Sequence, residues 1–308
     1  MERLLRLFNQ NLPISRRHFF QTAGRAVGVS AIGAMASGTY AYTVEPRWLE
    51  TNRYTVKLAK LPPAFTGVRI VQLSDLHHSE YLGREYLKEV FDAVMTEKPD
   101  LILITGDFIT GFHGNVKAYR RKTGDFFLRE LSDMLRKVKA PFGVWGCPGN
   151  HDFWYGFSAV SRFMKQSGIR ILRDEHVRLN RQNQQLLLIG LTDLWSEPIR
   201  WRRALRHTSK KDCRLVMMHN PDSFSQTVRF GLDFVMCGHT HGGQISLPFI
   251  GPPILPIANR AFVQGWFREG NTQMYVNRGI GVIGIPIRFN ARPEIAVFEL
   301  QPEESKLS

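Results

Sequence analysis

From residue 68 onward, short apolar runs alternate with amphipathic stretches. Runs such as 68–73 (VRIVQL) and 101–104 (LILI) are continuously apolar, which is typical of strands buried on both faces. Residues 86–96 carry apolar side chains at 87, 90, 91, 94 and 95, a spacing that predicts a helix. The alternation predicts a layered α/β domain. Further strands are predicted at 142–145, 185–191, 214–218, 234–237 and 296–300, and further helices at 128–135 and 158–166.

Polar side chains with metal-binding chemistry follow directly after several of these strands. Five short motifs carry them in one order: Asp75-Leu76-His77, Gly106-Asp107, Gly149-Asn150-His151-Asp152, His219, and Gly238-His239-Thr240-His241. In layered α/β proteins the carboxyl ends of the strands share one edge, where loops converge and ligands bind. We therefore expect these residues, which are distant in sequence, to meet in space.

The donor atoms of this set are imidazole nitrogens and side-chain oxygens, with no thiolate. Such a mixture suits borderline divalent ions, with Mn as the first candidate and Fe or Zn as alternatives. The set is too large for one tetrahedral site and fits two ions that share a carboxylate. Its members are Asp75, His77, Asp107, Asn150, His219, His239 and His241. The sequence therefore predicts a two-metal hydrolase.

Local geometry is expected to aim these donors. In Asp75-x-His77 and in His239-x-His241, alternate residues of an extended segment would point to the same side. Gly106, which lacks a Cβ, would let the backbone approach an ion closely.

In this order the motifs resemble the signature of the calcineurin-like metallophosphoesterase superfamily: D-x-H, G-D, G-N-H-[DE], a lone His, and G-H-x-H. The resemblance covers about residues 66–300. Local segments narrow it to the bacterial YaeI/YkuE-type phosphodiesterases: 192–195 (TDLW), 219–223 (HNPDS), 237–244 (CGHTHGGQ) and 292–294 (RPE). The likeness implies a four-layer αββα sandwich with the dimetal site at the C-terminal ends of the strands.

The resemblance also implies roles for single residues. The metal ligands would form two sets with one bridge: Asp75, His77 and His241 for one ion, Asn150, His219 and His239 for the other, and Asp107 between them. A metal-bridging hydroxide would attack phosphorus in line. His151 would bind no metal and would act as acid or charge stabiliser over the scissile phosphate, with Asp152 orienting its ring. Many family members have the motif G-D-x-x-D, whereas the last position of this motif is Thr110 here. We interpret Thr110 as a replaced residue that contacts a metal ligand, and not as a lost ligand.

Residues 1–41 do not read as part of the catalytic domain. Residues 15–20 (SRRHFF) resemble the twin-arginine export signal, and Ala34-Met35-Ala36 offers a small-x-small cleavage site. We expect export by the twin-arginine machinery to the periplasm or cell envelope, with an uncleaved N-terminal membrane anchor as the alternative. A connecting segment is expected at 42–65 and one catalytic domain at 66–302.

The charge balance of the chain indicates which classes of partner it could bind. The chain has 41 Lys and Arg against 27 Asp and Glu, a net charge of +14, and its first 36 residues hold only five Arg and one Glu. A basic body favours phosphorylated small molecules, lipids or an anionic membrane surface, with a generic basic surface as the alternative. No basic run interleaved with aromatic residues is present in the sequence, so nucleic acid is not expected. Cys147, Cys213 and Cys237 are expected to be buried free thiols.

The C-terminal third holds weaker hints about the substrate. Residues 245–258 (ISLPFIGPPILPIA) are apolar with four prolines, and they would border an acyl-chain groove or, as we expect, form a packed loop. Arg278, Arg288 and Arg292 would clamp phosphate oxygens or serve packing, the simpler interpretation. Trp195 would line the pocket or lie in the core.

These patterns together predict a dimetal phosphoester hydrolase, in the first place a phosphodiesterase. The alternative in the same class is a UDP-2,3-diacylglucosamine pyrophosphatase or another phospholipid-directed hydrolase at the membrane. From a different class, a catalytically silent protein that binds phosphorylated surfaces would fit the charge. The complete donor set argues against the silent protein.

Overall fold

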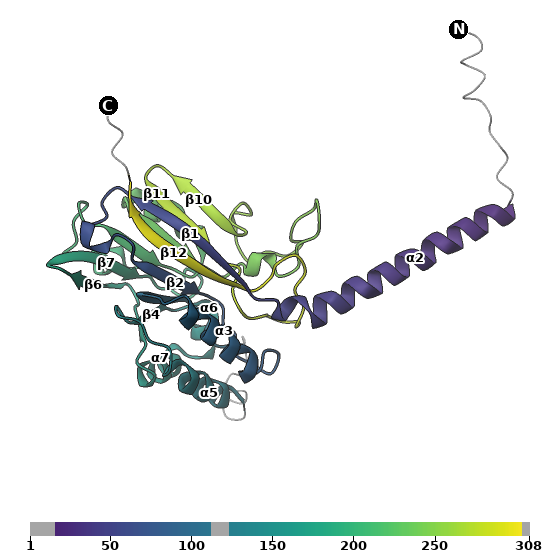
Figure 1. The fold of residues 1–308 in the computed structure, drawn as a ribbon, viewed down its shortest axis with the longest axis horizontal. Coiled ribbons are helices and arrows are strands. Elements are labelled where there is room, and N and C mark those ends of the chain that lie inside the picture. Colours follow the sequence, from purple (N-terminus) through teal and green to yellow (C-terminus); the bar gives the residue numbers. More distant parts are fainter. Residues whose placement is uncertain (1–15, 112–122, 304–308) are drawn as a thin grey trace, which may run out of the picture.

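Two mixed six-stranded sheets pack face to face, and helices cover their outer faces (Figure 1). The computed structural model describes residues 16–111 and 123–303. The strand orders are β1-β12-β2-β3-β4-β5 and β10-β11-β9-β8-β7-β6. The strands are β1 (Glu50–Leu58), β2 (Arg69–Leu73), β3 (Leu101–Thr105), β4 (Val144–Cys147), β5 (Arg170–Ile171), β6 (Glu175–Arg181), β7 (Gln184–Gly190), β8 (Arg214–Met217), β9 (Phe234–Cys237), β10 (Gly265–Glu269), β11 (Thr272–Val276) and β12 (Glu294–Pro302). The predicted αββα sandwich is confirmed.

The helices divide between the two outer faces. The first sheet packs against α3 (Arg84–Thr96), α5 (Asp125–Leu135) and α7 (Phe157–Gln166), and the second against α8 (Trp201–Ala204) and α9 (Phe224–Arg229). The other short helices are α6 (Asn150–Tyr155), η1 (Glu45–Arg47), η2 (Pro63–Phe65), η4 (Pro221–Ser223) and η5 (His241–Gly243).

The apolar runs of the sequence form strands that are buried on both sides. Leu101 and Leu103 of β3 pack between the two sheets, whereas Ile102 and Ile104 pack under the helices. Because successive side chains of a strand point to opposite faces, a strand in the middle of such layers needs an unbroken apolar run. The three cysteines are buried and free, as predicted.

Residues 42–65 contribute a strand, where the sequence analysis expects a connecting segment. Strand β1 pairs in parallel with β12 along its whole length, from Glu50 opposite Glu294 to Leu58 opposite Pro302. Its last residues, including Val56, are buried between the sheets. Most of β1 is polar because the strand lies at the edge of its sheet and is only half-buried. This edge strand is therefore part of the sandwich.

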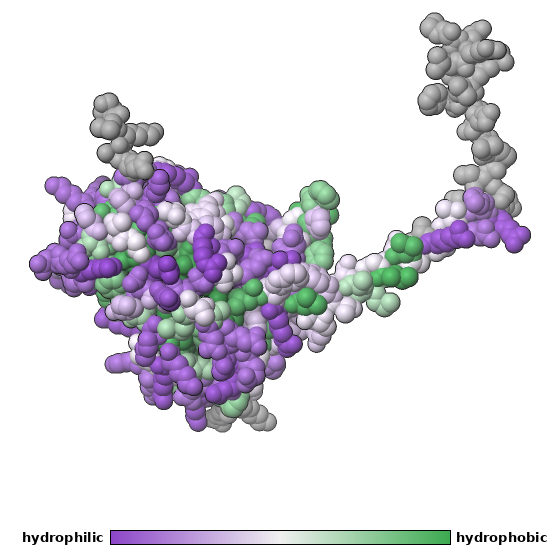
Figure 2. Space-filling model, viewed as in Figure 1, coloured by the Kyte–Doolittle hydropathy of each residue, from purple (hydrophilic) through white to green (hydrophobic). Residues whose placement is uncertain are grey.

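Helix α2 (Arg16–Thr43) projects away from the body (Figure 1). Its last turn contacts the body, where the backbone N–H of Arg288 donates to the carbonyl of Ala41 at 3.0 Å. Farther out, apolar side chains such as Val27 and Ile32 are exposed (Figure 2). Across 16–111 and 123–303, no helix is long and apolar enough to cross a membrane. The targeting role of residues 1–41 stays a prediction.

Candidate metal centre

All the predicted donors gather at one edge of the sandwich. They follow the carboxyl ends of β2, β3, β4, β8 and β9, in the order that the motifs have along the chain. Each of the seven donors is at most 4% exposed, and His151 beside them is 9% exposed. Parallel strands thus bring residues that are up to 166 positions apart, from Asp75 to His241, to a single buried cluster.

The donor atoms form three overlapping groups. Within each group the ligand atoms lie within 4.8 Å of one another: Asp75, His77 and His241; Asp107, His219 and His239; and His77, Asp107 and His151. Asp107 Oδ2 lies 3.0 Å from His219 Nε2 and 3.4 Å from His77 Nε2. One carboxylate oxygen therefore lies between the first two groups, the position that a bridging ligand of two ions requires.

Backbone turns, and not an extended segment, aim the donors. Positive φ angles occur at Asp75 (51°), His77 (42°), Asp107 (53°), His239 (71°) and His241 (53°). Residues other than glycine rarely adopt this left-handed conformation, and such strain concentrates at functional sites. The sequence predicts that an extended backbone places alternate donors on the same side, and this explanation is wrong because the backbone turns at these residues. His239 and His241 belong to different groups of donor atoms.

Hydrogen bonds on the outer side fix two of the rings. His219 Nδ1 lies 2.7 Å from the carbonyl oxygen of Thr105, to which an Nδ1–H donates. His77 Nδ1 lies 3.3 Å from Thr110 Oγ1. In both rings Nε2 then faces Asp107, so each tautomer suits a ligand. Thr110 contacts His77, which agrees with our interpretation of this departure from the family pattern.

Asp152 holds the Asp107 loop and does not orient His151. Its carboxylate accepts backbone N–H groups from Asp107 at 3.0 Å, from the following residue at 3.0 Å, and from Gly149 at 2.8 Å. The ring of His151 is instead held by the Gly111 carbonyl, 2.7 Å from Nδ1. The predicted orientation by Asp152 is wrong, because these three donors already occupy its carboxylate.

Some contacts of the site carry no sequence signal. The carbonyls of Thr105 and Gly111 orient His219 and His151, but any residue type could supply a carbonyl. Trp154 packs edge-on against His151, with ring centroids 4.5 Å apart. Its position three residues after His151 on helix α6 could have indicated this contact.

Burial and mutual charge set the protonation of the cluster. Burial lowers the pKa of His77 and lowers that of His239 to about 3, so both rings are neutral, as metal binding requires. Burial acts to raise the pKa of Asp107, but the charges of His219, His151 and His77 and the hydrogen bond from His219 together outweigh it, and the pKa lies well below its usual range. Conversely, Asp107 and Asp75 raise the pKa of His219 against its burial. The carboxylates thus attract positive charge to the centre of the cluster.

The donors present fit divalent cations. His77 Nε2 and His241 Nε2 are 3.2 Å apart, and His239 Nδ1 and His219 Nε2 are 3.1 Å apart, so ring nitrogens converge in pairs. The side-chain oxygen of Asn150 is buried without a hydrogen-bond partner in the described parts of the chain. Converging ring nitrogens, two ionised carboxylates and an unpaired carbonyl oxygen form a nitrogen and oxygen donor set of the borderline type.

Glycines allow the cluster to close. At Gly149 a Cβ would lie 2.2 Å from Asp107 Oδ1, and at Gly106 it would lie 2.6 Å from His219 Nδ1. Side chains at these two positions would occupy the space of the carboxylate and the ring. Gly106 thus allows the His219 ring to approach closely, Gly149 does the same for the Asp107 carboxylate, and the predicted approach of the Gly106 backbone to an ion stays a prediction.

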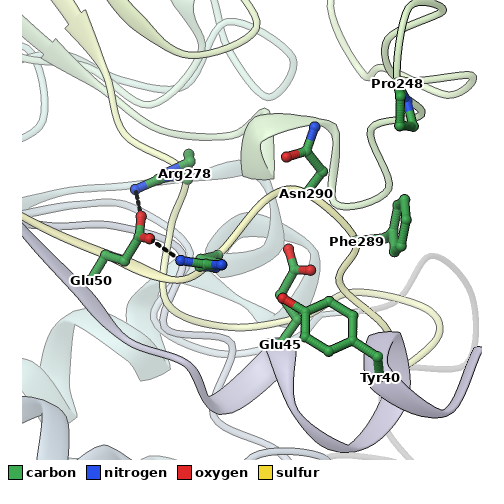
Figure 3. A pocket seen from close by; sticks show the side chains of 8 residues that line it. Tyr40, Glu45, Glu50, Pro248, Arg278, Phe289 and Asn290 are labelled. Carbon is green, nitrogen blue, oxygen red and sulfur yellow. Dashed lines mark hydrogen bonds and ion pairs between the residues drawn. The ribbon is translucent and has the colours of Figure 1, made fainter. Parts of the chain in front are cut away.

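The three C-terminal arginines serve packing. Arg288 is buried and donates to backbone carbonyls, among them Ala291 at 2.6 Å. Arg278 and Arg292 both pair with Glu50, at 2.8 and 2.7 Å, in a cavity of about 470 Å³ beside helix α2 (Figure 3). Burial acts to raise the pKa of Glu50, but the hydrogen bonds from Arg292 and Arg278 lower it overall. Arg278 and Arg292 thus already have a carboxylate partner in the protein, so a phosphate is not needed to account for their positions.

The apolar segment 245–258 is packed only in part: Ile257 is buried, but the expectation of a packed loop is wrong for the tip. Phe249 is fully exposed, Ile254 is 81% exposed and Ile250 is 77% exposed. Trp195 is 48% exposed and stands edge-on to His239, with ring centroids 4.6 Å apart. Trp195 therefore borders the site and is not a core residue.

Comparisons with known proteins agree with this geometry. Residues 68–243 match the family described as calcineurin-like phosphoesterase. The chain is 35% identical to the uncharacterized metallophosphoesterase YkuE of Bacillus subtilis, over 94% of this chain and 98% of that protein. It is 30% identical to the phosphodiesterase YaeI of Escherichia coli, over 93% and 99%. It is 26% identical to the UDP-2,3-diacylglucosamine pyrophosphatase LpxG of Chlamydia muridarum, over 90% and 98%.

The fold and the buried donor cluster define a metal-dependent phosphoester hydrolase. The chain belongs to the calcineurin-like metallophosphoesterase family.

Proposed function

We propose that this protein is a phosphodiesterase that works with two divalent ions, Mn in the first place and Fe or Zn as alternatives. The observation that carries the proposal is the position of Asp107 Oδ2, 3.0 Å from His219 Nε2 and 3.4 Å from His77 Nε2. A carboxylate shared by two imidazole-rich groups is suited to two ions side by side. The likeness to YaeI supports a phosphodiester as the substrate.

The proposed ligands are those of the sequence analysis. One ion would be held by Asp75, His77 and His241, the other by Asn150, His219 and His239, with Asp107 shared. When bound, the ions would supply the positive charge that polarises phosphate oxygens and acidifies water. The chain itself would position the phosphate, keep His77 and His239 neutral, and keep the two carboxylates ionised.

His151 is the residue that we propose to act on the substrate directly. It is the most exposed member of the cluster at 9%, compared with at most 4% for the seven donors. With an Nδ1–H donating to the Gly111 carbonyl, Nε2 is left free to contact a phosphate or leaving-group oxygen. There it would stabilise charge or protonate the leaving oxygen. Asp152 would support this by holding the Asp107 loop.

Hydrolysis of bis(p-nitrophenyl) phosphate tests the proposal. The protein is stripped of metal and then reconstituted with Mn, Fe or Zn. We expect about two ions per chain by metal analysis, and activity only after reconstitution. Asp107→Asn should nearly abolish activity, whereas Asp92→Asn, on an exposed side chain of α3, should not change it. Full hydrolysis in excess chelator after dialysis would disprove the assignment.

A pyrophosphatase acting on UDP-2,3-diacylglucosamine is the second candidate, and the likeness to LpxG favours it. Release of UMP from that lipid, compared with hydrolysis of simple phosphodiesters by the same preparation, separates the two. A silent phosphate-binding protein would hydrolyse neither compound after reconstitution.

For the N-terminus we propose twin-arginine export, with a retained anchor as the alternative. Support comes from Arg16 and Arg17, which begin helix α2 at the end far from the body (Figure 1). The variant Arg16→Lys/Arg17→Lys should remain in the cytoplasm and keep its activity after purification. Wild-type protein found wholly in the soluble cytoplasmic fraction would contradict export.

A further inference from the structure

An apolar cavity opens directly beside the donor cluster. It measures about 320 Å³, and His241 is one of the residues that line it. Four isoleucines also line it: Ile245, Ile254, Ile283 and Ile285. None of these four side chains can hydrogen-bond to a phosphate or a sugar, so the cavity is suited to an aliphatic chain attached to a group held at His241.

The loop that borders this cavity carries an exposed apolar tip, defined here as Phe249, Ile250 and Ile254. All three are at least 77% exposed. Asp222 holds the far end of the loop through the backbone N–H groups of residues 258 and 259, at 2.7 and 3.0 Å. Exposed apolar groups gathered on an anchored loop are typical of a surface that contacts a membrane or another protein.

The tip lies on the side of the body from which helix α2 departs. Tyr40 of α2 and Pro248 of the loop line the same cavity (Figure 3). Arg260 in the same loop region donates to the carbonyl of Pro252, which keeps a cation close to the tip. The chain as a whole has a net charge of +14, which favours an anionic over a neutral lipid surface.

We propose that the apolar tip inserts into the surface of an anionic bilayer and that the cavity takes one acyl chain of a lipid phosphoester. This inference rests on the proposed function, because it names the substrate class of the same site. The phosphoester would lie at the metal centre while its chain runs past His241 between Ile254 and Ile285. The tip would bring the cavity mouth to the bilayer, so that the chain passes from lipid to protein with little exposure to water.

Chain-length selectivity tests the cavity. We define it as kcat/KM for dodecyl p-nitrophenyl phosphate divided by kcat/KM for the methyl ester, below the micelle concentration. Each buried methylene is worth about fourfold in binding, so we expect at least about 100-fold selectivity in the full-length protein. Ile254→Asn and Ile285→Asn should each reduce this ratio about tenfold or more. Met95→Asn, an exposed apolar position on α3, should leave it unchanged.

Vesicle binding tests the tip separately. Full-length protein is sedimented with vesicles of phosphatidylcholine and phosphatidylglycerol. Phe249→Ser/Ile250→Ser should weaken the partition of the protein onto vesicles about tenfold or more, because it removes the apolar side chains that would insert. Met95→Asn is the control, because it also removes an exposed apolar side chain but leaves the tip intact. Both tip residues are exposed, and thermal melts check that the variants are folded.

The outcomes separate the two proposals. If the methyl ester is hydrolysed and the selectivity of Ile254→Asn equals that of wild type, the cavity proposal fails and the phosphodiesterase stands. If no ester is hydrolysed, calorimetry with dodecyl phosphonate decides: binding weakened by Ile254→Asn supports the cavity although the function fails. If Phe249→Ser/Ile250→Ser abolishes self-association in sedimentation velocity but leaves vesicle binding intact, the tip is a protein interface and the lipid proposal fails.

Discussion

Replacing Gly149 by Ala would place a methyl group against the carboxylate proposed to bridge the two ions. The new Cβ would lie 2.2 Å from Asp107 Oδ1 and 2.6 Å from the backbone nitrogen of Asp107. Gly149 itself has φ −108° and ψ 175°, an extended conformation that alanine adopts freely. The substitution therefore acts through this contact and not through backbone strain.

The size of the effect follows from the distance. Ordinary contact of a Cβ begins near 3.4 Å, so the carboxylate oxygen must move by roughly 1 Å. A displacement of about 1 Å at a reacting centre costs on the order of 100-fold in rate. The same oxygen accepts the backbone N–H of His151 at 2.9 Å, so the motion also disturbs the neighbouring His151. We expect kcat/KM to fall about 100-fold, with fewer than two ions bound per chain.

The assay measures kcat/KM on bis(p-nitrophenyl) phosphate, metal content by mass spectrometry and the melting temperature. Gly83→Ala is the matched control, because its Cβ would meet nothing within 4 Å and its φ is −68°. If Gly149→Ala keeps wild-type rate and metal content, the Asp107 carboxylate is not needed in the position described. An equal loss in Gly83→Ala would show that the effect is not specific to the site.

Three further changes test separate contacts. Thr110→Val removes the oxygen beside His77 Nδ1 and should weaken metal affinity about 10- to 100-fold in a metal titration; unchanged affinity would exclude a role for the hydroxyl. His151→Ala should keep both ions and lose about 10²–10⁴-fold in rate. The loss should be larger for alkyl than for p-nitrophenyl leaving groups, because an alkoxide needs protonation to leave. If the variant loses an ion, His151 is a metal ligand instead. Glu50→Gln should lower the free energy of unfolding by about 1 kcal/mol at pH 7 in urea titrations. Because the folded-state pKa of Glu50 is lowered, this difference should shrink as the pH falls below 4.5; a constant difference would contradict the ion pairing.

The chemistry and placement of the donors could be predicted from the sequence. Each donor follows an apolar run, and such runs form strands whose carboxyl ends meet at one edge. Asp75 and His241 lie 166 positions apart, yet the order of the motifs and the layered pattern were enough to predict that they meet in one cluster. Local patterns encode which faces are buried, and residue type encodes which atoms can bind a cation.

Only the tertiary structure decided how the donors are held. The left-handed turns at Asp75 and His77 and the carbonyl of Gly111 that orients His151 depend on packing between distant segments. The direction of the Asp152 carboxylate was decided in the same way, because three backbone N–H groups from two loops compete for it. A motif specifies a side chain, but the partners of that side chain come from the rest of the fold.

Tertiary structure also decided the fate of the less regular segments. Strand β1 is polar and half-buried, and its role at the sheet edge appears only when β12, more than two hundred residues later, pairs with it. The loop at 245–258 has the composition of a packed segment, yet the sandwich already has its layers filled, so Phe249 and Ile250 remain exposed. Composition records how apolar a segment is, whereas burial depends on whether the completed core has room for it.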